Sequence, residues 1–196
     1  VPEFMKGEAD ITPAARGTLT HKVLELIPFD EMLDETNVRE FVESLPEKGF
    51  MSAREAEAVD CRKVAAFFKS DTGRRLRDAQ WIRREWPFTL RKSRDEIAAM
   101  AANDDIKEEM RSSLAENVLI QGIIDCCFRD DRGIVVVDYK TDWVDRKNKD
   151  SEIARLREEY RRQLELYSEV IERSLGERPE SVVLFLLDSG DAVNIF

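Results

Sequence analysis

The sequence predicts an α/β domain built on a mixed β-sheet flanked by helices. Two apolar runs within 123–137, separated by a Gly-containing turn, indicate an antiparallel hairpin. A long helical pattern over 150–175 is followed by a buried strand pattern over 182–187. Because a strand that returns after a helical crossover can pair in parallel, the sheet should combine both orientations.

The first third of the chain is expected to be helical. An apolar stripe over 18–27 indicates one helix, and further helices are expected over 35–44 and within 55–70. Asp71-Thr-Gly73 is expected to interrupt the helical run before a last helix begins at Arg74. No internal repeat or low-complexity linker is visible in this region or elsewhere.

The remaining elements complete the sheet. A strand is expected over 81–90, followed by a polar, acidic, helix-prone segment over 95–116 that is predicted to be a mobile insertion. The hairpin comes next, and Gly176 stands where the C-cap of the long helix should be. The last residues, 192–196, are expected to pair beside the strand over 182–187.

Composition limits the class of protein. With 196 residues the chain is long enough for a substantial core, and we expect 1–196 to form a single domain. No apolar run reaches the length of a membrane span, and no signal-peptide pattern is present. Cys61, Cys126 and Cys127 cannot form a disulfide framework, which favours a reducing, cytoplasmic setting. Without a Cys-x-x-Cys pair, a zinc ribbon or an iron–sulfur cluster held within this chain is not expected.

The charge is unevenly distributed. A net charge of −10 argues against a free-standing nucleic-acid binder. Between Arg74 and Arg94, however, eight basic residues stand against two acidic ones, a local balance of +6, with aromatic residues among them. Such a mixture can contact phosphates and bases, so Trp81, Arg83 and Arg84 are candidate nucleic-acid contacts. The alternative interpretation is a solvated face with a few core aromatics.

Two carboxylates and a lysine are expected at neighbouring strand ends. Asp125 lies near the start of the first hairpin strand and Asp138 near the end of the second, so the hairpin brings them together. Paired buried carboxylates are unfavourable unless a cation lies between them, which points to Mg²⁺ or Mn²⁺. Lys140 follows on the same strand face, where it can orient water or stabilise developing negative charge. A metal with a lysine suits phosphodiester hydrolysis.

These residues resemble a known family. Asp125 followed by Asp138-Tyr-Lys140 resembles the signature of the PD-(D/E)XK nucleases. Arg16-Gly-Thr-Leu-Thr-His21 is similar to the Gly-x-x-x-His element of the RecB-like branch of that family, and Gln163-Leu-Glu-Leu-Tyr167 is similar to its Gln-x-x-x-Tyr motif. Four elements in the family's order form a specific signal. The resemblance is strongest to the nuclease domains of bacterial helicase–nucleases, and it does not extend to 95–116.

The resemblance implies a restriction-endonuclease-like (RecB-type) nuclease core and a metal site. His21, Asp125 and Asp138 would bind the metal, with the carbonyl of Tyr139 as a further ligand. Lys140 would be the catalytic lysine. The family therefore implies a deoxyribonuclease that depends on Mg²⁺ or Mn²⁺.

Supporting roles are implied for residues around this set. Gln163 and Tyr167, which lie one turn apart on one helix face, would lie over the site and position Lys140 or the DNA backbone. Glu85 stands where relatives often carry a Glu before an aromatic strand end. Asp142 is expected to be structural or a partner of Lys140, and Tyr160 is assigned to the core.

The family also implies a setting. The reaction would be exonucleolytic on a single-stranded DNA end, in double-strand-break repair and homologous recombination at the nucleoid. The chain lacks the Gly-x-x-x-x-Gly-Lys-Ser/Thr loop, so a helicase motor would lie elsewhere in a longer chain, and the partner of that chain would be a second protein subunit. A stand-alone exonuclease, a catalytically inactive nuclease fold that binds DNA, and an acidic regulatory protein with chance matches are the alternatives. An intact Asp125, Asp138 and Lys140 set argues against an inactive fold.

Overall fold

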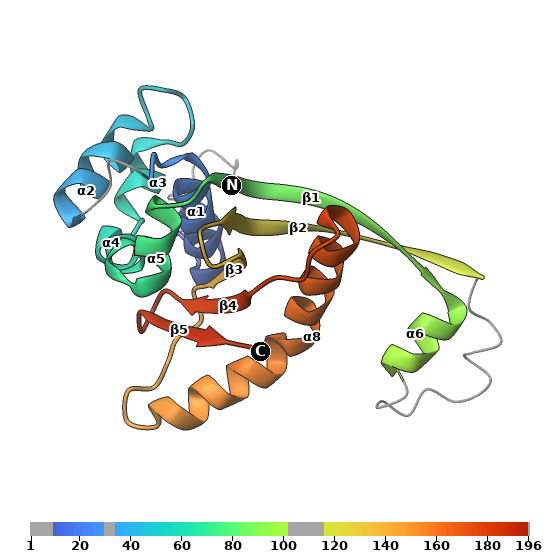
Figure 1. Ribbon diagram of the computed structural model, residues 1–196. Coiled ribbons are helices and arrows are strands. Elements are labelled where there is room, and N and C mark those ends of the chain that lie inside the picture. The colour runs from blue at the N-terminus through green and yellow to red at the C-terminus, as the bar shows by residue number, and fades with distance from the viewer. Residues whose placement is uncertain (1–9, 30–33, 102–115, 196) are drawn as a thin grey trace, which may run out of the picture.

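A mixed β-sheet forms the centre of the molecule (Figure 1). The computed structural model describes residues 10–29, 34–101 and 116–195. Its strands follow the order β1-β2-β3-β4-β5, and only the β3–β4 pair is parallel. The strands are β1 Trp81–Ser93, β2 Asn117–Arg129, β3 Ile134–Lys140, β4 Ser181–Leu186 and β5 Asp191–Asn194. The mixed α/β sheet predicted from the sequence is therefore confirmed.

Helices cover both faces of this sheet (Figure 1). They are α1 Pro13–Leu26, α2 Glu35–Ser44, α3 Ala53–Glu57, α4 Cys61–Lys69, α5 Asp71–Arg77, α6 Arg94–Ala101 and α8 Lys149–Leu175. Apolar residues of α1 to α5, such as Phe67, pack with Phe128 on one sheet face. Residues of α8, such as Leu164, pack with Leu184 on the other. Burial of these two clusters drives the layered arrangement. Among the described residues, none of the helices is both long and apolar enough to cross a bilayer.

Three helix boundaries differ from the prediction because side chains cap them. α1 begins at Pro13, before the predicted start, since Thr12 caps it and proline fits the first turn. The single helix expected within 55–70 is two, because α3 ends at Glu57 and Asp60 caps the start of α4. The interruption expected at Asp71-Thr-Gly73 falls at Ser70, which caps α5, and these three residues form the first turn of that helix.

The β1–β2 ribbon is longer than predicted. β1 continues to Ser93 and β2 begins at Asn117, because the two strands pair with each other beyond the helical layers, out to α6 (Figure 1). Of the expected insertion over 95–116, the first residues belong to α6. Residues 102–115 lie outside the described residues.

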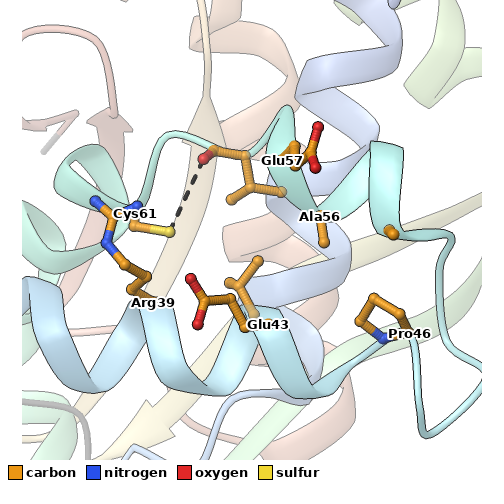
Figure 2. A pocket seen from close by; sticks show the side chains of 9 residues that line it. Arg39, Glu43, Pro46, Ala56, Glu57 and Cys61 are labelled. Atoms are coloured by element: carbon orange, nitrogen blue, oxygen red, sulfur yellow. Dashed lines mark hydrogen bonds between the residues drawn. The ribbon is translucent and has the colours of Figure 1, made fainter.

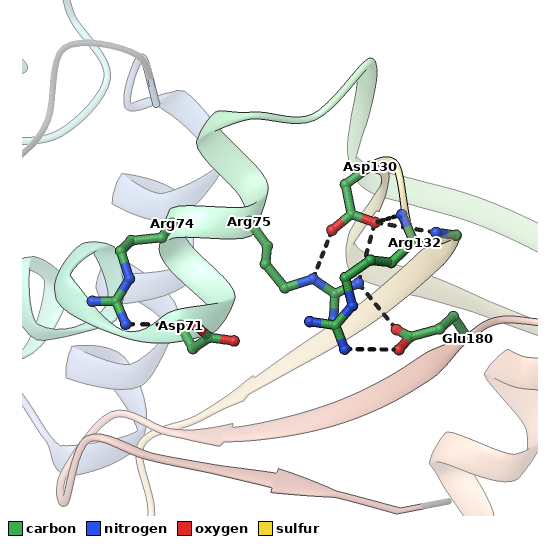
Figure 3. A network of polar contacts seen from close by, with 7 residues as sticks. Asp71, Arg74, Arg75, Asp130, Arg132 and Glu180 are labelled. Atoms are coloured by element: carbon green, nitrogen blue, oxygen red, sulfur yellow. Dashed lines mark hydrogen bonds and ion pairs between the residues drawn. The ribbon is translucent and has the colours of Figure 1, made fainter.

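An ion-pair network around buried Asp130 ties α5 to the β2–β3 turn (Figure 3). Arg75 Nε lies 2.6 Å from Asp130 Oδ2, and Arg75 Nη2 lies 3.0 Å from Glu180 Oε2. Asp130 also accepts the backbone N–H groups of Arg132 and Gly133. The Arg75 hydrogen bond holds the pKa of Asp130 below its usual range, despite the opposing effect of burial. The network fixes the hairpin whose strands carry Asp125 and Asp138.

Candidate metal centre

Three potential metal ligands from three elements meet beside the sheet. His21 comes from α1, Glu85 from β1 and Asp125 from β2, and their ligand atoms lie within 4.8 Å of one another. His21 Nδ1 is 3.6 Å from Asp125 Oδ2. All three side chains are half-buried. Two of these residues, His21 and Asp125, were predicted as metal ligands. The third, Glu85, was given no defined role by the sequence.

Glu85 reaches this group because β1 changes its alternation there. Arg84 Nη1 donates to the carbonyl of Ile27, so its side chain faces the α1 side, and Glu85 beside it also faces His21. Trp86 then packs into the α8 cluster. Two consecutive residues on one face require a backbone irregularity, and Glu85 has φ +45°. A non-glycine residue in the left-handed region costs about 1–3 kcal/mol, a strain typical of functional sites.

β2 changes its alternation at the same level. Cys126 packs in the α1–α5 cluster, whereas Ile124 and Cys127, which ought to lie on opposite faces, both pack in the α8 cluster. The ladder pairs the residues on either side, but Glu85 and Asp125 themselves are not a ladder pair. The matched irregularity turns both carboxylates toward α1.

Gly17 determines how closely α1 approaches the sheet. A Cβ added at Gly17 would lie 2.9 Å from Thr141 Oγ1, in the loop that follows β3. Gly17 and His21 are one helical turn apart and share a face. The missing side chain at Gly17 therefore lets α1 rest on the Thr141 loop and holds His21 beside Asp125. This explains the Gly-x-x-x-His spacing in physical terms.

Asp138 and Lys140 form a second, adjoining pair at the end of β3. Asp138 is only 1% exposed, and Lys140 Nζ lies 2.6 Å from its Oδ2. The contact is an ion pair without hydrogen-bond alignment, so that oxygen has no aligned donor among the described residues. Tyr139, between the two, donates its backbone N–H to Asp125 Oδ2 at 2.8 Å. Asp138 is thus next to the group of three but not part of it.

The electrostatics of the site favour a cation. Burial and then the Asp125 charge raise the pKa of Glu85. Burial also raises the pKa of Asp138, with Lys140 opposing it and Asp125 adding to it. For His21, burial alone would lower the pKa, but the hydrogen bond and charge of Asp125 outweigh it and the pKa is raised. Crowded carboxylates beside an imidazole fit a hard divalent cation.

Lys140 is held by an aromatic residue that was expected in the core. Its Nζ lies 4.5 Å from the ring centroid of Tyr160, which is half-buried on α8. The Tyr160 hydroxyl donates to Asp142 Oδ2 at 3.1 Å. Tyr160 precedes Gln163 by three residues, so the helical spacing of the Gln-x-x-x-Tyr motif could have indicated its orientation.

Gln163 and Tyr167 contact β2 through hydrogen bonds. Gln163 Nε2 donates to the Tyr167 hydroxyl at 2.7 Å, and that hydroxyl donates to the carbonyl of Ile123 at 2.9 Å. Phe88 packs edge-on against the Tyr167 ring. The motif therefore anchors the strand two residues before Asp125. Neither of these two hydrogen bonds reaches Lys140.

Much of the positive charge over 74–94 is used inside the protein. Arg75 pairs with Asp130, buried Lys92 lies 2.6 Å from Glu169, and Arg84 holds the Ile27 carbonyl. Among the predicted nucleic-acid contacts, Arg83 is exposed over the Trp86 ring. Trp81 and Arg83 line a hollow of about 610 Å³ near the end of α8.

A separate cavity of about 340 Å³ lies between α2, α3 and α4 (Figure 2). Arg39, Glu43 and Cys61 line it. Burial raises the pKa of the Cys61 thiol, so the sulfur stays protonated and is a poor nucleophile. The cavity is therefore not a candidate centre for nucleophilic chemistry.

Comparison with known proteins gives a consistent result. Residues 2–194 match the family model of the PD-(D/E)XK nuclease superfamily. The chain is 37% identical over 191 residues to an ATP-dependent helicase/nuclease subunit from Desulforudis audaxviator (strain MP104C), which covers 97% of this chain and 14% of that protein. It is 34% identical over 194 residues to the protein of the same name from Alkaliphilus oremlandii (strain OhILAs), covering 99% of this chain and 15% of that protein.

A third relative, from Geobacillus thermodenitrificans (strain NG80-2), carries the same name and is 38% identical over 175 residues, 88% of this chain and 13% of that protein. The chain thus spans only a small part of the length of the curated relatives that it matches. The family model, by contrast, extends over nearly all of its 196 residues. Together with the mixed sheet and the residues gathered beside it, this match shows that the chain belongs to the PD-(D/E)XK nuclease superfamily.

Proposed function

We propose that this chain is a deoxyribonuclease that needs Mg²⁺ or Mn²⁺ and hydrolyses phosphodiester bonds, exonucleolytically, in single-stranded DNA. One observation carries the proposal. The His21–Glu85–Asp125 group adjoins a buried aspartate paired with a lysine, Asp138 with Lys140. Oxygen and imidazole ligands beside a fixed cation are what a metal-assisted attack on a phosphate requires.

His21, Glu85 and Asp125 would hold the metal, and Asp138 offers a further carboxylate next to them. The carbonyl of Tyr139 stays a predicted ligand. A divalent cation, when bound, supplies a Lewis acid for the phosphate and lowers the pKa of a coordinated water. Because imidazole is a softer ligand than carboxylate, Mn²⁺ should serve as well as Mg²⁺. An iron–sulfur cluster within this chain is not proposed.

Lys140 would act on the phosphate or on the attacking water. Its ammonium group is held between Asp138 and the Tyr160 ring, so the charge is oriented before substrate arrives. Such preorganised charge can orient a water or stabilise the extra negative charge of the transition state. Gln163 and Tyr167 would act by fixing β2, which carries Asp125.

The names of the relatives suggest the setting. They are helicase/nuclease subunits, and we propose that this chain is the nuclease domain, residues 1–196, of such a protein (AddA). Helicase domains in the same full-length chain would deliver a single-stranded DNA end, AddB would be the partner protein, and the work would be double-strand-break repair and recombination. Trp81 and Arg83 are proposed DNA contacts. Arg84 is engaged with Ile27 and would contribute less.

The test is cleavage of end-labelled single- and double-stranded DNA with Mg²⁺, Mn²⁺ or EDTA. We expect single strands to be cut only with metal. Asp138→Ala and the isosteric Asp138→Asn should both lose cleavage, whereas Asp131→Asn, an exposed position in the β2–β3 turn, should keep it. Cleavage that survives in both Asp138 variants would contradict the assignment. If the wild type shows no cleavage, metal binding by calorimetry decides: a domain that binds the metal would need its helicase domains and partner, whereas absent metal binding would favour the inactive, DNA-binding fold.

A further inference from the structure

Trp143 is the most exposed of the large hydrophobic side chains in the described residues, at 70%. It lies three residues after Lys140, in the loop between β3 and α8. The next residue, Val144, is buried. A tryptophan left in solvent loses the favourable burial of its ring, and exposed apolar surface of this kind marks interaction sites.

The loop that carries Trp143 is fixed on both sides. Thr141 rests against α1 at Gly17. On the other side, the Val144 N–H donates to Asp188 Oδ2 at 3.1 Å, and Lys63 Nζ holds Asp188 Oδ1 at 2.6 Å. The backbone around the indole therefore has defined partners. The exposure of Trp143 follows from where this anchored loop places it.

The surface beside Trp143 is basic although the chain is acidic. Trp143 lines a hollow of about 250 Å³, and a second hollow of about 270 Å³ shares Lys63 and Asp188 with the first. The ionisable residues lining the two are Arg16, Asp60, Arg62, Lys63, Arg146 and Asp188. Four cations against two carboxylates give +2, where the whole chain carries −10. Asp188 pairs with Lys63 and Asp60 with Arg62, so Arg16 and Arg146 supply the excess positive charge.

We propose that Trp143 and this basic surface form a subsite for single-stranded DNA, in which the indole stacks on one base and the cations hold neighbouring phosphates. The inference rests on the proposed nuclease function and adds a substrate-binding element to it. Exposed aromatics next to cations are how proteins bind single strands without sequence preference. Three residues span at most about 10 Å, so the stacked base would lie close to the phosphate at Lys140. The excess of cations favours a polyanion over a protein partner here.

The experiment measures binding separately from cleavage. Fluorescence anisotropy with a labelled oligothymidylate of about 16 nucleotides, in EDTA, gives Kd for the wild type, Trp143→Ala and Trp143→Phe. We expect Trp143→Ala to weaken binding about tenfold, and Trp143→Phe to keep most of the affinity. Phe50→Ala, which removes another exposed aromatic far from the site in sequence, is the matched control and should bind as the wild type does. Because Trp143 is exposed, none of these changes should unfold the protein.

Each of the other outcomes tests either the DNA subsite or the proposed nuclease function. An unchanged Kd in Trp143→Ala, or no measurable binding by the wild type, overturns the subsite. Arg146→Gln should reduce the dependence of log K on log salt by about 0.7, as expected for one lost phosphate contact. Trp143-dependent binding without metal-dependent cleavage would keep the subsite and leave the proposed nuclease unsupported. Cleavage with an unchanged KM in Trp143→Ala would do the reverse.

Discussion

The ammonium nitrogen of Lys140 lies 4.5 Å from the centroid of the Tyr160 ring and 2.6 Å from Asp138 Oδ2. The ring is itself oriented, because the Tyr160 hydroxyl donates to Asp142 Oδ2. Asp142 follows Lys140 by two residues, so the lysine and the residue that orients its aromatic neighbour come from one short segment. Tyr160 is therefore a positioning residue for the Lys140 charge.

Substitutions at Tyr160 should separate the ring from the hydroxyl. A cation–π contact contributes about 0.5–2 kcal/mol, so Tyr160→Leu should lower kcat by about 2- to 30-fold. Tyr160→Phe keeps the ring, loses the bond to Asp142, and should lose less. Single-turnover cleavage of labelled single strands measures both.

KM and metal affinity serve as controls. Neither Tyr160 variant should change them, because Tyr160 is not part of the His21–Glu85–Asp125 group. If Tyr160→Phe and Tyr160→Leu lower kcat equally, the hydroxyl rather than the ring face positions Lys140.

The local part of the site could be predicted from sequence because local rules place it. Strand alternation puts Asp138 and Lys140 on one face, and the hairpin register, with Arg129 opposite Ile134, brings Asp125 toward Asp138. The hairpin, the long helix ending at Gly176 and the parallel return of β4 followed from pattern alone and are confirmed. Each depends on residues near in sequence or on a strong apolar period.

The rest depends on tertiary packing that no local pattern encodes. His21 was found only through a family motif, because the approach of α1 depends on the contact between Gly17 and Thr141. Glu85 could not be placed from alternation, since its left-handed backbone reverses the very period on which such a prediction relies. Tyr160 was predicted to lie in the core and does pack against the α8 cluster, but its contact with Lys140 depends on how α8 lies over β3.

Gly17→Ala should disturb the metal site through α1. The added Cβ would meet Thr141 Oγ1 at 2.9 Å, closer than normal contacts, so either the Thr141 side chain rotates away or α1 shifts and carries His21 with it. We expect weaker Mn²⁺ binding by calorimetry, although alanine favours the helix by about 1 kcal/mol over glycine. Thr141→Ala removes Oγ1 and leaves the Thr141 Cβ position at 3.9 Å, an ordinary contact.

The double variant Gly17→Ala/Thr141→Ala should therefore recover Mn²⁺ affinity relative to Gly17→Ala. A double-mutant cycle with Thr141→Ala alone isolates this coupling. Additive effects of the two changes would show that the close contact does not position His21.

Glu85→Gln should make the metal-free protein more stable and the metal weaker in binding. Burial is the largest cause of the raised pKa of Glu85. Repulsion by the Asp125 carboxylate, which no cation offsets in the metal-free protein, is the next. Removing one charge relieves that repulsion, so the melting temperature in EDTA should rise. Mn²⁺ affinity should fall about tenfold or more, because the loss of a residue that only orients a metal ligand already weakens metal binding by about 10–100-fold.

Differential scanning fluorimetry with EDTA and with Mn²⁺ measures both effects of Glu85→Gln at once. Glu47→Gln, at an exposed position, removes the same charge elsewhere and should change neither. An unchanged stabilisation by Mn²⁺ in Glu85→Gln would remove Glu85 from the ligand set and leave His21 and Asp125 with Asp138.

Arg75→Ala should destabilise the fold in a pH-dependent way. Arg75 is the partner of nearly buried Asp130, and removal of one member of such a pair costs about 2–3 kcal/mol or more because the other charge is left unpaired (Figure 3). Arg74→Ala breaks only exposed contacts, with Asp71 on the same helix and with the Lys69 carbonyl, and should stay within about 0.5 kcal/mol of the wild type.

The sign of the pH effect follows from Asp130. Its folded pKa is lowered, chiefly by the Arg75 hydrogen bond, so the stabilisation is present above the ordinary aspartate pKa of 3.8 and is lost as pH falls through the lowered value. Urea unfolding of the wild type and Arg75→Ala should therefore show the full difference at neutral pH and a smaller one at acid pH, below the lowered pKa of Asp130. If the difference is the same at both pH values, Arg75 stabilises α5 by packing and by Glu180, and the charge on Asp130 is not what holds the hairpin to the helix.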